Sequence, residues 1–360
     1  MKKTMIALFL AGTMLLTGCA GLLEREYVSV TPHNTAPVTD GDPSILKADN
    51  YQELVNALLY FITLGMQQGT VRLYTDWDNV EQQLEKACLE VVQEDPLGAY
   101  SVEFIKHAVN PLVPYTEAKV QITYRRSREQ VAAIASVTGT TAIRSELKEA
   151  LAAFAPECVL RISYFDQDEA FIRSLARQAY YDSPMSALDI PDLEVSIYPD
   201  VGRQRIVELN MTYHLDEDTL RQRRDQLGQA VADMSRNIPF SGSDTYLKSA
   251  AQVLQSNVQY LSDGGTTAWD AVTTRKANSE GMALAFSALC QQLHLPCRVV
   301  QGTRNEETHF WNVVSTSSGW RHLDLTRSEY ALLLDTQASD LGYSWNHGSI
   351  PKCVSPPIAP

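Results

Sequence analysis

Three residues in the C-terminal third of this 360-residue sequence have the types that nucleophilic acyl transfer requires. Ser279 offers a hydroxyl, His309 an imidazole and Asp324 a carboxylate. In such a set the carboxylate accepts a hydrogen bond from one ring nitrogen, which fixes the tautomer and aims the other nitrogen at the nucleophile. The three positions are far apart in the sequence, so the chemistry depends on the elements that carry them.

Two predicted strands carry the imidazole and the carboxylate. The first contains His309-Phe310-Trp311-Asn312, and the second runs from Trp320 to Asp324. A four-residue hairpin loop over 315–318 would place His309 directly opposite Asp324. Because side chains alternate across a strand, both would share a face with Trp311. The alternative interpretation is a surface histidine and aspartate that meet by chance in a hairpin.

A helix is predicted to begin near Ser279. Its apolar residues recur at helical spacing, so this face can pack on the predicted sheet. They are Met282, Phe286, Leu289, Cys290 and Leu293. Either Asn278 or Ser279 can cap this helix by accepting a backbone N–H. The sequence therefore leaves two roles for the hydroxyl, nucleophile and cap.

Together these segments resemble the transglutaminase-like superfamily, whose papain-like core has a nucleophilic cysteine at a helix start, then a histidine strand and an aspartate strand. The matching segments are Glu280-Gly281-Met282-Ala283, Leu295-Pro296-Cys297, Gly302-Thr303, His309-Phe310-Trp311-Asn312 and Leu323-Asp324-Leu325-Thr326. Upstream, Tyr260, Thr267-Ala268-Trp269 and Ala271-Val272 are similar to the lead-in to the nucleophile. The resemblance covers about a hundred residues. It implies a nucleophile helix packed on an antiparallel sheet, with Ser279, His309 and Asp324 at the triad positions.

The sequence departs from that family at the nucleophile, where Ser279 replaces cysteine. A thiol with a pKa of about 8.5 ionises readily beside an imidazole, whereas a hydroxyl needs concerted proton removal and an oxyanion hole. Our first hypothesis is a domain that has lost catalysis and binds peptide or cell-wall ligands in a cleft lined by His309, Trp311 and Trp269. The second is an active hydrolase or transferase using Ser279, His309 and Asp324. The third is a structural or assembly protein of the cell envelope.

The first half of the chain contains an internal duplication. A shift of 89 residues places Leu54 on Ile143, and Thr123-Tyr124 on Thr212-Tyr213. Both copies change periodicity in the same order of helix, strand, helix and strand, which predicts tandem α/β subdomains with insertions or deletions between the copies. No catalytic set of residues is recognisable in either copy.

The N-terminus resembles a bacterial lipoprotein signal peptide. Lys2 and Lys3 precede a short apolar stretch that ends in Leu16-Thr17-Gly18-Cys19. The resemblance implies cleavage before Cys19 and attachment of a diacylglycerol to its thiol, which would hold the chain on the extracytoplasmic face of a cell membrane. The alternative is an ordinary secretory signal that happens to contain a cysteine.

Composition narrows the possible partners. The formal net charge is −13, and no cluster of Lys and Arg is present. Nucleic acids and anionic lipid headgroups attract clustered basic residues, so neither is an expected partner. Five cysteines remain after Cys19, and Cys290 and Cys297 are expected to pack as small apolar side chains. We expect no cofactor and no metal site, and the sequence does not indicate the oligomeric state.

These observations predict an α+β protein with seven segments. They are a signal peptide over 1–18, a lipidated tether over 19–47, α/β repeats over 48–136 and 137–225, a helical linker over 226–245, a transglutaminase-like domain over 246–345 and a C-terminal tail over 346–360.

Overall fold

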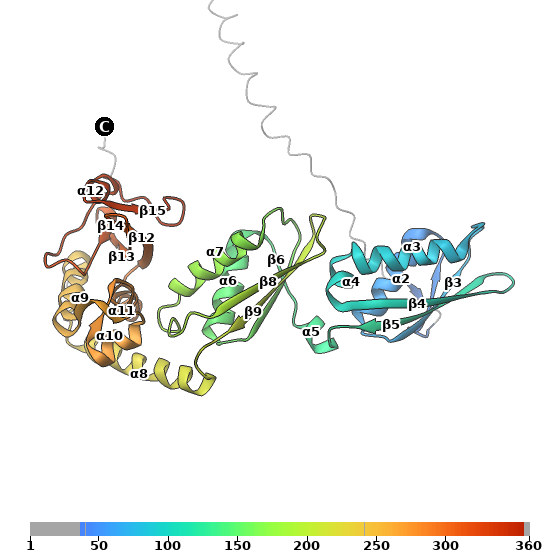
Figure 1. Cartoon of the computed structure of the whole chain (residues 1–360), viewed down its shortest axis with the longest axis horizontal. Helices are drawn as coiled ribbons and strands as arrows, with labels where there is room; N and C mark the ends of the chain where they lie inside the picture. Colours follow the sequence, from blue (N-terminus) through green and yellow to red (C-terminus); the bar gives the residue numbers. More distant parts are fainter. Residues whose placement is uncertain (1–36, 40, 241, 356–360) are drawn as a thin grey trace, which may run out of the picture.

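The computed structural model describes residues 37–39, 41–240 and 242–355, so Cys19 and the predicted signal peptide lie outside the described residues. Three units follow one another along the chain, coloured blue, green, and yellow to red in Figure 1. Helices and sheets both contribute to the fold, which confirms the predicted α+β class. Within the described ranges, every helix is too short or too polar to cross a bilayer.

The first unit is built on a five-stranded sheet with the strand order β1-β2-β3-β5-β4. Strands β2 and β3 are parallel, and the other neighbours are antiparallel. Apolar residues of one sheet face pack on α2 and α3, and Phe61 is fully buried between these layers. The elements are β1 (Val38–Thr39), β2 (Ile45–Ala48), α2 (Tyr51–Thr63), β3 (Gln68–Leu73), α3 (Val80–Gln93), α4 (Pro96–Ser101), β4 (Val102–Pro111) and β5 (Thr116–Tyr124).

The second unit repeats this topology, with the sheet order β6-β7-β9-β8. Strands β6 and β7 are parallel, as β2 and β3 are in the first unit, and the later pairs are antiparallel. A short helix α5 (Arg128–Ala132), which begins with a capping box at Ser127, joins the two units. The elements of the second unit are β6 (Ala135–Val137), α6 (Gly139–Ala152), β7 (Glu157–Ile162), α7 (Glu169–Tyr181), β8 (Asp192–Tyr198) and β9 (Arg205–Thr212).

The offset between corresponding elements of the two units stays within one residue of 89. Corresponding elements begin 89 residues apart, at Gln68 and Glu157, at Val80 and Glu169, and at Thr116 and Arg205. The other three pairs begin 88 or 90 residues apart: β2 and β6, α2 and α6, and β4 and β8. Near the start of β4, the β4–β5 register shifts at a bulge between Val102 and Phe104. One extra residue in an antiparallel pair can be absorbed locally in this way.

Part of the predicted tether belongs to the first sheet. Residues Ile45–Ala48 form β2, which pairs in parallel with β3, and Leu46 and Ala48 are fully buried. The segment is too short to show a convincing period in the sequence. Its strand conformation becomes favourable only when β3 satisfies its backbone groups.

The C-terminal unit packs helices against a four-stranded antiparallel sheet of order β14-β13-β12-β15. Helix α11 lies against β12 and β13 and is buried along nearly its whole length, as predicted for the nucleophile helix. The elements are α8 (Glu217–Arg236), α9 (Ser243–Asn257), β10 (Gln259–Gly265), α10 (Ala268–Thr274), β11 (Lys276–Ala277), α11 (Ser279–Gln292), β12 (Cys297–Arg304), β13 (Glu307–Thr316), β14 (Gly319–Leu323), α12 (Asp335–Asp340) and β15 (Tyr343–Trp345).

The β13–β14 hairpin has a tighter turn than the one we predicted. Thr316 pairs with Gly319, so the loop has two residues instead of four, and Gly319 adopts a φ of 97° that favours glycine. The register therefore moves by two positions, and Asp324 falls just beyond the end of β14. Because the side-chain period of a strand is also two, the predicted face is preserved.

Two predicted segments at the edges of this unit have different extents in the structure. The connection from the second unit is helix α8, which starts at Glu217, nine residues before the predicted linker. The predicted tail is packed against the fold up to Cys353, which is fully buried and whose carbonyl accepts the Asp335 N–H at 2.8 Å. A backbone bridge of this kind leaves no hydrophobic pattern in the sequence.

A buried ion pair joins the first two units. Arg126 lies after β5 and donates to Glu208 of β9 at 2.7 Å, and the Glu208 side chain is 2% exposed. Tyr198 also donates to Glu208 at 3.2 Å, and its ring meets Tyr100 of α4 edge to face. Burial raises the pKa of Glu208, and the neighbouring Arg126 opposes that shift. The second sheet is thus covered by α4 on the side that its own helices leave open.

We expect Arg126→Leu to lower the free energy of unfolding by about 2–3 kcal/mol, because Glu208 would remain buried without its cation. The double variant Arg126→Leu/Glu208→Leu should be more stable than the single one, since both charges are then absent. Urea unfolding of the whole chain measures both values. A loss below about 0.5 kcal/mol in the single variant would place this pair among ordinary surface ion pairs.

Candidate functional site

The N-terminus of α11 is capped by Asn278. Its side-chain oxygen accepts the N–H of Gly281 at 3.0 Å, and its backbone is extended. Of the two capping residues that the sequence allowed, Asn278 fills the role and Ser279 becomes the first helical residue. Gly281 is required here because an added Cβ would lie 2.4 Å from the carbonyl oxygen of Gly265. The helix start is therefore pressed closely against β10.

The Ser279 hydroxyl points at β13. Its Oγ accepts a hydrogen bond from the backbone N–H of Phe310 at 3.3 Å, and the residue is 8% exposed. Phe310 lies beyond the stretch of β13 that pairs with β14, so its N–H is free for this contact. Within the described part of the chain, no hydrogen bond joins Ser279 to the His309 ring. One of the two lone pairs of the hydroxyl oxygen therefore accepts an amide donor.

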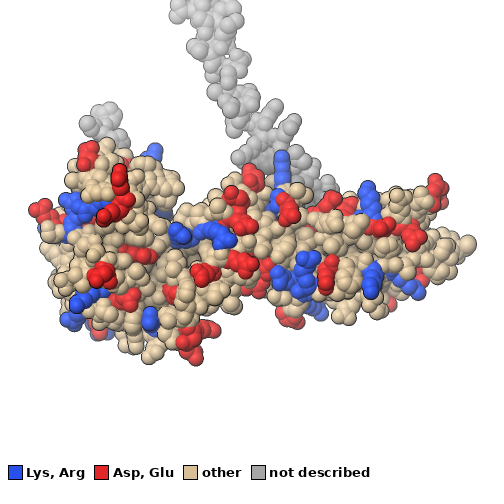
Figure 2. Space-filling view, viewed as in Figure 1, with Lys and Arg blue, Asp and Glu red and all other residues tan. Residues whose placement is uncertain are grey.

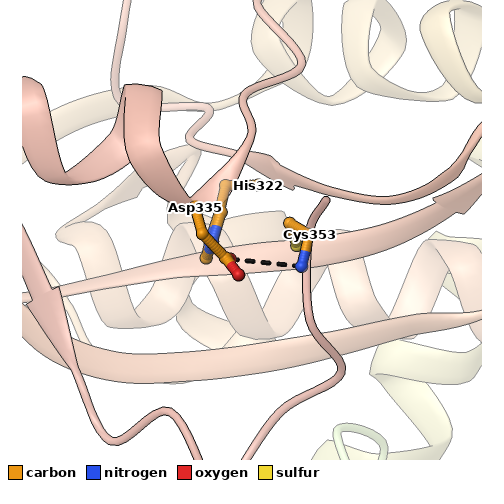
Figure 3. A group of neighbouring side chains, drawn as sticks. All are labelled: His322, Asp335 and Cys353. Carbon is orange, nitrogen blue, oxygen red and sulfur yellow. Dashed lines mark hydrogen bonds and ion pairs between the residues drawn. The ribbon is translucent and has the colours of Figure 1, made fainter. Parts of the chain in front are cut away.

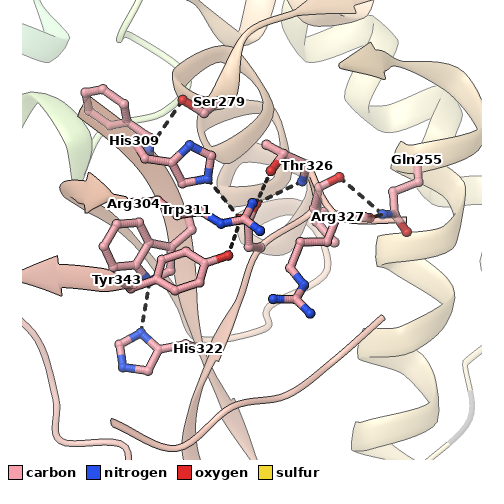
Figure 4. A network of polar contacts seen from close by, with 12 residues as sticks. Gln255, Ser279, Arg304, His309, Trp311, His322, Thr326, Arg327 and Tyr343 are labelled. Carbon is pink, nitrogen blue, oxygen red and sulfur yellow. Dashed lines mark hydrogen bonds and ion pairs between the residues drawn. The ribbon is translucent and has the colours of Figure 1, made fainter. Parts of the chain in front are cut away.

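His309 and Asp324 do meet, although by a diagonal contact. The Nε2 atom of His309 lies 2.9 Å from Oδ2 of Asp324, and both residues are buried. An ionised carboxylate can only accept, so the ring donates from Nε2 and keeps Nδ1 as its second site. In Figure 4 the other ring nitrogen is directed toward the helix end that carries Ser279.

The Asp324 carboxylate accepts hydrogen bonds from several residues, and Figure 4 shows its neighbours His309, Tyr343 and Thr326. Tyr343 of β15 donates to Oδ2 at 2.6 Å, and Arg304 of β12 lies 3.6 Å from the same oxygen. Oδ1 accepts from both the backbone N–H and the hydroxyl of Thr326, at 2.9 and 2.7 Å. Burial would raise the pKa of Asp324, but the hydrogen bonds from His309, Tyr343 and Thr326 outweigh it and hold that pKa below its usual value.

The sequence did not identify Tyr343 or Arg304 as site residues. Burial, together with the nearby Asp324 carboxylate, raises the pKa of Tyr343 to about 12, so its hydroxyl stays protonated and donates. Tyr343 lies beyond the segments that resemble the family, and β15 is only three residues long. No sequence pattern could have placed it beside Asp324.

A cleft of about 620 Å³ opens above these residues. Ser279, His309 and Arg304 lie on its wall, and polar residues dominate the rest. The first N–H groups of a helix have no partner within the helix and carry partial positive charge, so the start of α11 offers donors to a carbonyl or carboxylate oxygen. The other lining residues are Tyr260, Ser262, Asn278, Glu280, Asn305, Glu307, Thr308 and Phe310.

The second unit reaches this cleft through Tyr181 of α7. Its hydroxyl donates to Glu280 at 2.8 Å, and its ring packs on Phe310 at a centroid distance of 5.5 Å. Burial raises the pKa of Glu280, while the hydrogen bond from Tyr181 and the charge of Arg177 oppose the shift. The repeat is therefore in direct contact with the residue that follows Ser279.

Neither tryptophan predicted to line the ligand cleft is found at its surface. Trp311 is 1% exposed and lies beneath His309, with its ring stacked at 6.2 Å. Trp269 of α10 faces α8, where its indole N–H donates to Gln226 at 2.8 Å and Arg223 lies over its ring. Trp311 supports the imidazole from below, and Trp269 fastens α10 to the connecting helix.

A second polar group lies on the same face of the sheet as Trp311, where His322, Asp335 and Cys353 bring three metal-binding atom types within 4.8 Å of one another (Figure 3). These residues are far apart in the sequence, so no sequence motif predicted the cluster. However, Trp311 donates its indole N–H to Nδ1 of His322 at 2.9 Å, so that nitrogen carries no proton. A neutral ring then bears its proton on Nε2 and donates to Asp335 at 2.9 Å. This tautomer blocks the nitrogen that a metal would need, and the cluster fits a hydrogen-bonded relay.

Burial lowers the pKa of His322 below 6.5, against the opposing effect of Asp335. The unfolded chain therefore binds a proton at this residue before the folded chain does, and the free energy of unfolding should fall as pH decreases below about 6.5. Urea unfolding between pH 7.5 and 5.5 should show this slope, and His322→Gln should reduce it. The exposed His214, whose pKa is raised by Asp189, is the control, and His214→Gln should leave the His322 contribution in place.

Comparison with known proteins identifies this unit. Residues 236–325 match the model of the transglutaminase-like superfamily, so the chain contains a transglutaminase-like domain, and the resemblance drawn from the sequence is confirmed. None of the curated proteins matches the chain.

Two solved structures with similarity to the chain carry related names. The first is described as a TGase; it is 13% identical, with a TM-score of 0.28, over 52% of this chain and 57% of that chain. The second is named "a Putative Cysteine Protease from Cytophaga hutchinsonii"; it is 18% identical, with a TM-score of 0.26, over 42% of this chain and 70% of that chain.

Proposed function

We propose that the transglutaminase-like domain binds a peptide in the cleft at the start of α11 without forming a covalent intermediate. The observation that carries this proposal is the state of the Ser279 hydroxyl, which accepts the Phe310 N–H and forms no hydrogen bond with His309 among the described residues. A serine nucleophile needs its proton directed at a base, because its hydroxyl does not ionise in the way a thiol does. Here the hydroxyl serves as a structural acceptor.

The chemistry of the cleft wall supports a ligand with amide or carboxylate groups. Arg304 is a cation at one side, and the start of α11 supplies backbone donors. Glu280 and Glu307 line the same cleft, so its wall offers acceptors as well as donors. A peptide backbone or a side-chain amide presents both kinds of group and can satisfy both.

One observation favours a second function, acyl transfer by Ser279. The His309–Asp324 contact is kept at 2.9 Å and is reinforced by Tyr343 and Thr326. A site without catalysis has no need for an oriented imidazole. In that mechanism Ser279 would attack a carbonyl carbon, His309 would take the hydroxyl proton at Nδ1, and the helix start would stabilise the oxyanion.

A serine-directed fluorophosphonate probe separates the two functions. We expect no labelling of Ser279 in the wild-type chain, because the hydroxyl is not activated. The variant Ser279→Cys should gain reactivity toward iodoacetamide at position 279, and His309→Ala in that background should lose most of it. Peptide mass spectrometry locates the label and separates it from the natural cysteines. Labelling of wild-type Ser279 that disappears in His309→Ala would establish the acyl-transfer function instead.

We also propose that the chain is held at the extracytoplasmic face of a membrane by a lipid on Cys19. The support is the Leu16-Thr17-Gly18-Cys19 segment and the basic residues before the apolar stretch. A net acidic chain gains nothing from anionic headgroups, so acyl chains would have to provide the attachment.

Expression in a bacterial host with radiolabelled palmitate tests this attachment. The wild-type chain should incorporate label and sediment with membranes, and Cys19→Ser should do neither. The matched control is Cys88→Ser, because Cys88 is buried in the first unit and its loss should leave labelling unchanged. Label retained by Cys19→Ser would refute the proposal.

A further inference from the structure

A second cleft, of about 450 Å³, lies where the second unit meets the C-terminal unit. We call it the junction cleft. Its wall includes Arg144 of α6, Arg173 and Arg177 of α7, and Arg298 of β12, against the single acidic residue Asp182. Basic side chains are visible at this junction in Figure 2, beside the helix that Figure 1 labels α7. This local excess of positive charge contrasts with the net charge of −13 for the whole chain.

Two of the four arginines are already engaged and two are available. Arg144 lies 3.6 Å from Asp182, and Arg173 contacts both Glu169 and the carbonyl oxygen of Leu193. Among the described residues, no acidic side chain lies within ion-pair distance of Arg177 or Arg298. Guanidinium groups bind carboxylates through paired hydrogen bonds, so these two are ready for an anionic ligand.

The floor of the junction cleft is an open strand edge. Strand β12 pairs with β13 along its whole length, but β15 covers only Gly302, Thr303 and Arg304 on the other side. The Ser315 N–H donates to the carbonyl oxygen of Pro296, which shows which residues of β12 direct their N–H groups toward β13. Since direction alternates along an antiparallel strand, the N–H groups of Val299 and Gln301 point away from β13. Both residues line the cleft.

We propose that the junction cleft binds an acidic peptide in an extended conformation. The peptide backbone adds to β12 at Val299 and Gln301, and its carboxylates meet Arg177 and Arg298. An exposed edge with unpaired N–H groups is a template for strand addition, and the arginines select the charge of the added strand. A phosphate polymer could use the arginines but has no backbone to pair with the edge. This site is separate from the cleft at Ser279 and does not depend on the function proposed there.

Fluorescence anisotropy of the full chain with a labelled hexapeptide of alternating glutamate and valine tests the charge requirement. We expect binding of this probe and none of the lysine–valine peptide of the same length. Arg177→Ala and Arg298→Ala should each weaken binding about tenfold, the effect of one charge-assisted hydrogen bond. The control Arg236→Ala removes an exposed arginine of α8 that pairs with Asp233, and it should leave the affinity unchanged.

The backbone requirement is tested separately. Gln301→Pro removes an N–H that points away from β13, so it should preserve the β12–β13 ladder and weaken binding about tenfold, whereas Gln301→Ala should bind normally. Glutamate–valine probes methylated on alternate backbone nitrogens give the same test on the unmodified protein. Two such probes carry their methyl groups on opposite sets of nitrogens, and only the probe whose methyl groups face β12 should lose affinity. Failure of the acidic peptide to bind would overturn the proposal. So would equal affinity for inorganic polyphosphate with no effect of N-methylation, which would reveal a plain anion site.

Discussion

The C-terminal domain is organised around one buried carboxylate. Asp324 lies just past the end of β14, where its two oxygens accept hydrogen bonds from His309 on β13, Tyr343 on β15 and Thr326 in the following loop. A buried charge without such donors would cost several kcal/mol, so every segment that supplies one is held in position by the same requirement. Asp324 therefore links side chains of the central strand β13, the edge strand β15 and the following loop, in addition to the backbone pairing that orders the sheet.

Beside that carboxylate, aromatic and polar contacts continue along the same face of the sheet. His309 stacks on Trp311, whose indole donates to His322, and His322 in turn donates to Asp335. Each donor in this series fixes the tautomer or orientation of the next group. The outcome is an imidazole with a defined orientation, which is an arrangement suited to proton transfer, next to a hydroxyl that is bonded elsewhere. The His309–Asp324 pair thus has more supporting contacts than the Ser279 hydroxyl.

The duplicated units are joined to this domain by specific contacts. Tyr181 of the second unit bonds to Glu280 beside the site, and the buried Arg126–Glu208 pair joins the second unit to the first. A hydrophobic cluster also runs continuously from the second unit into α11. The second unit forms part of the wall of the junction cleft, so a ligand bound there would contact two units at once. At the cleft beside Ser279 the second unit contributes through Tyr181, which contacts the lining residues Glu280 and Phe310.

The sequence alone determined the principal helices and strands of the repeats and of the C-terminal domain, but not the short strands β2 and β15. The spacing of apolar residues located α11 and the repeated helices, and the alternation in β13 and β14 put His309 and Asp324 on one face, because strand periodicity survives a register change of two. The sequence also contained enough of the family pattern to identify the transglutaminase-like domain. Only the tertiary structure decided the two-residue hairpin, the Ser279–Phe310 contact, and the places of Tyr343, Tyr181, Trp269 and Trp311. These depend on contacts between residues far apart in the chain. Such contacts follow from how whole elements pack and leave no local pattern in the sequence.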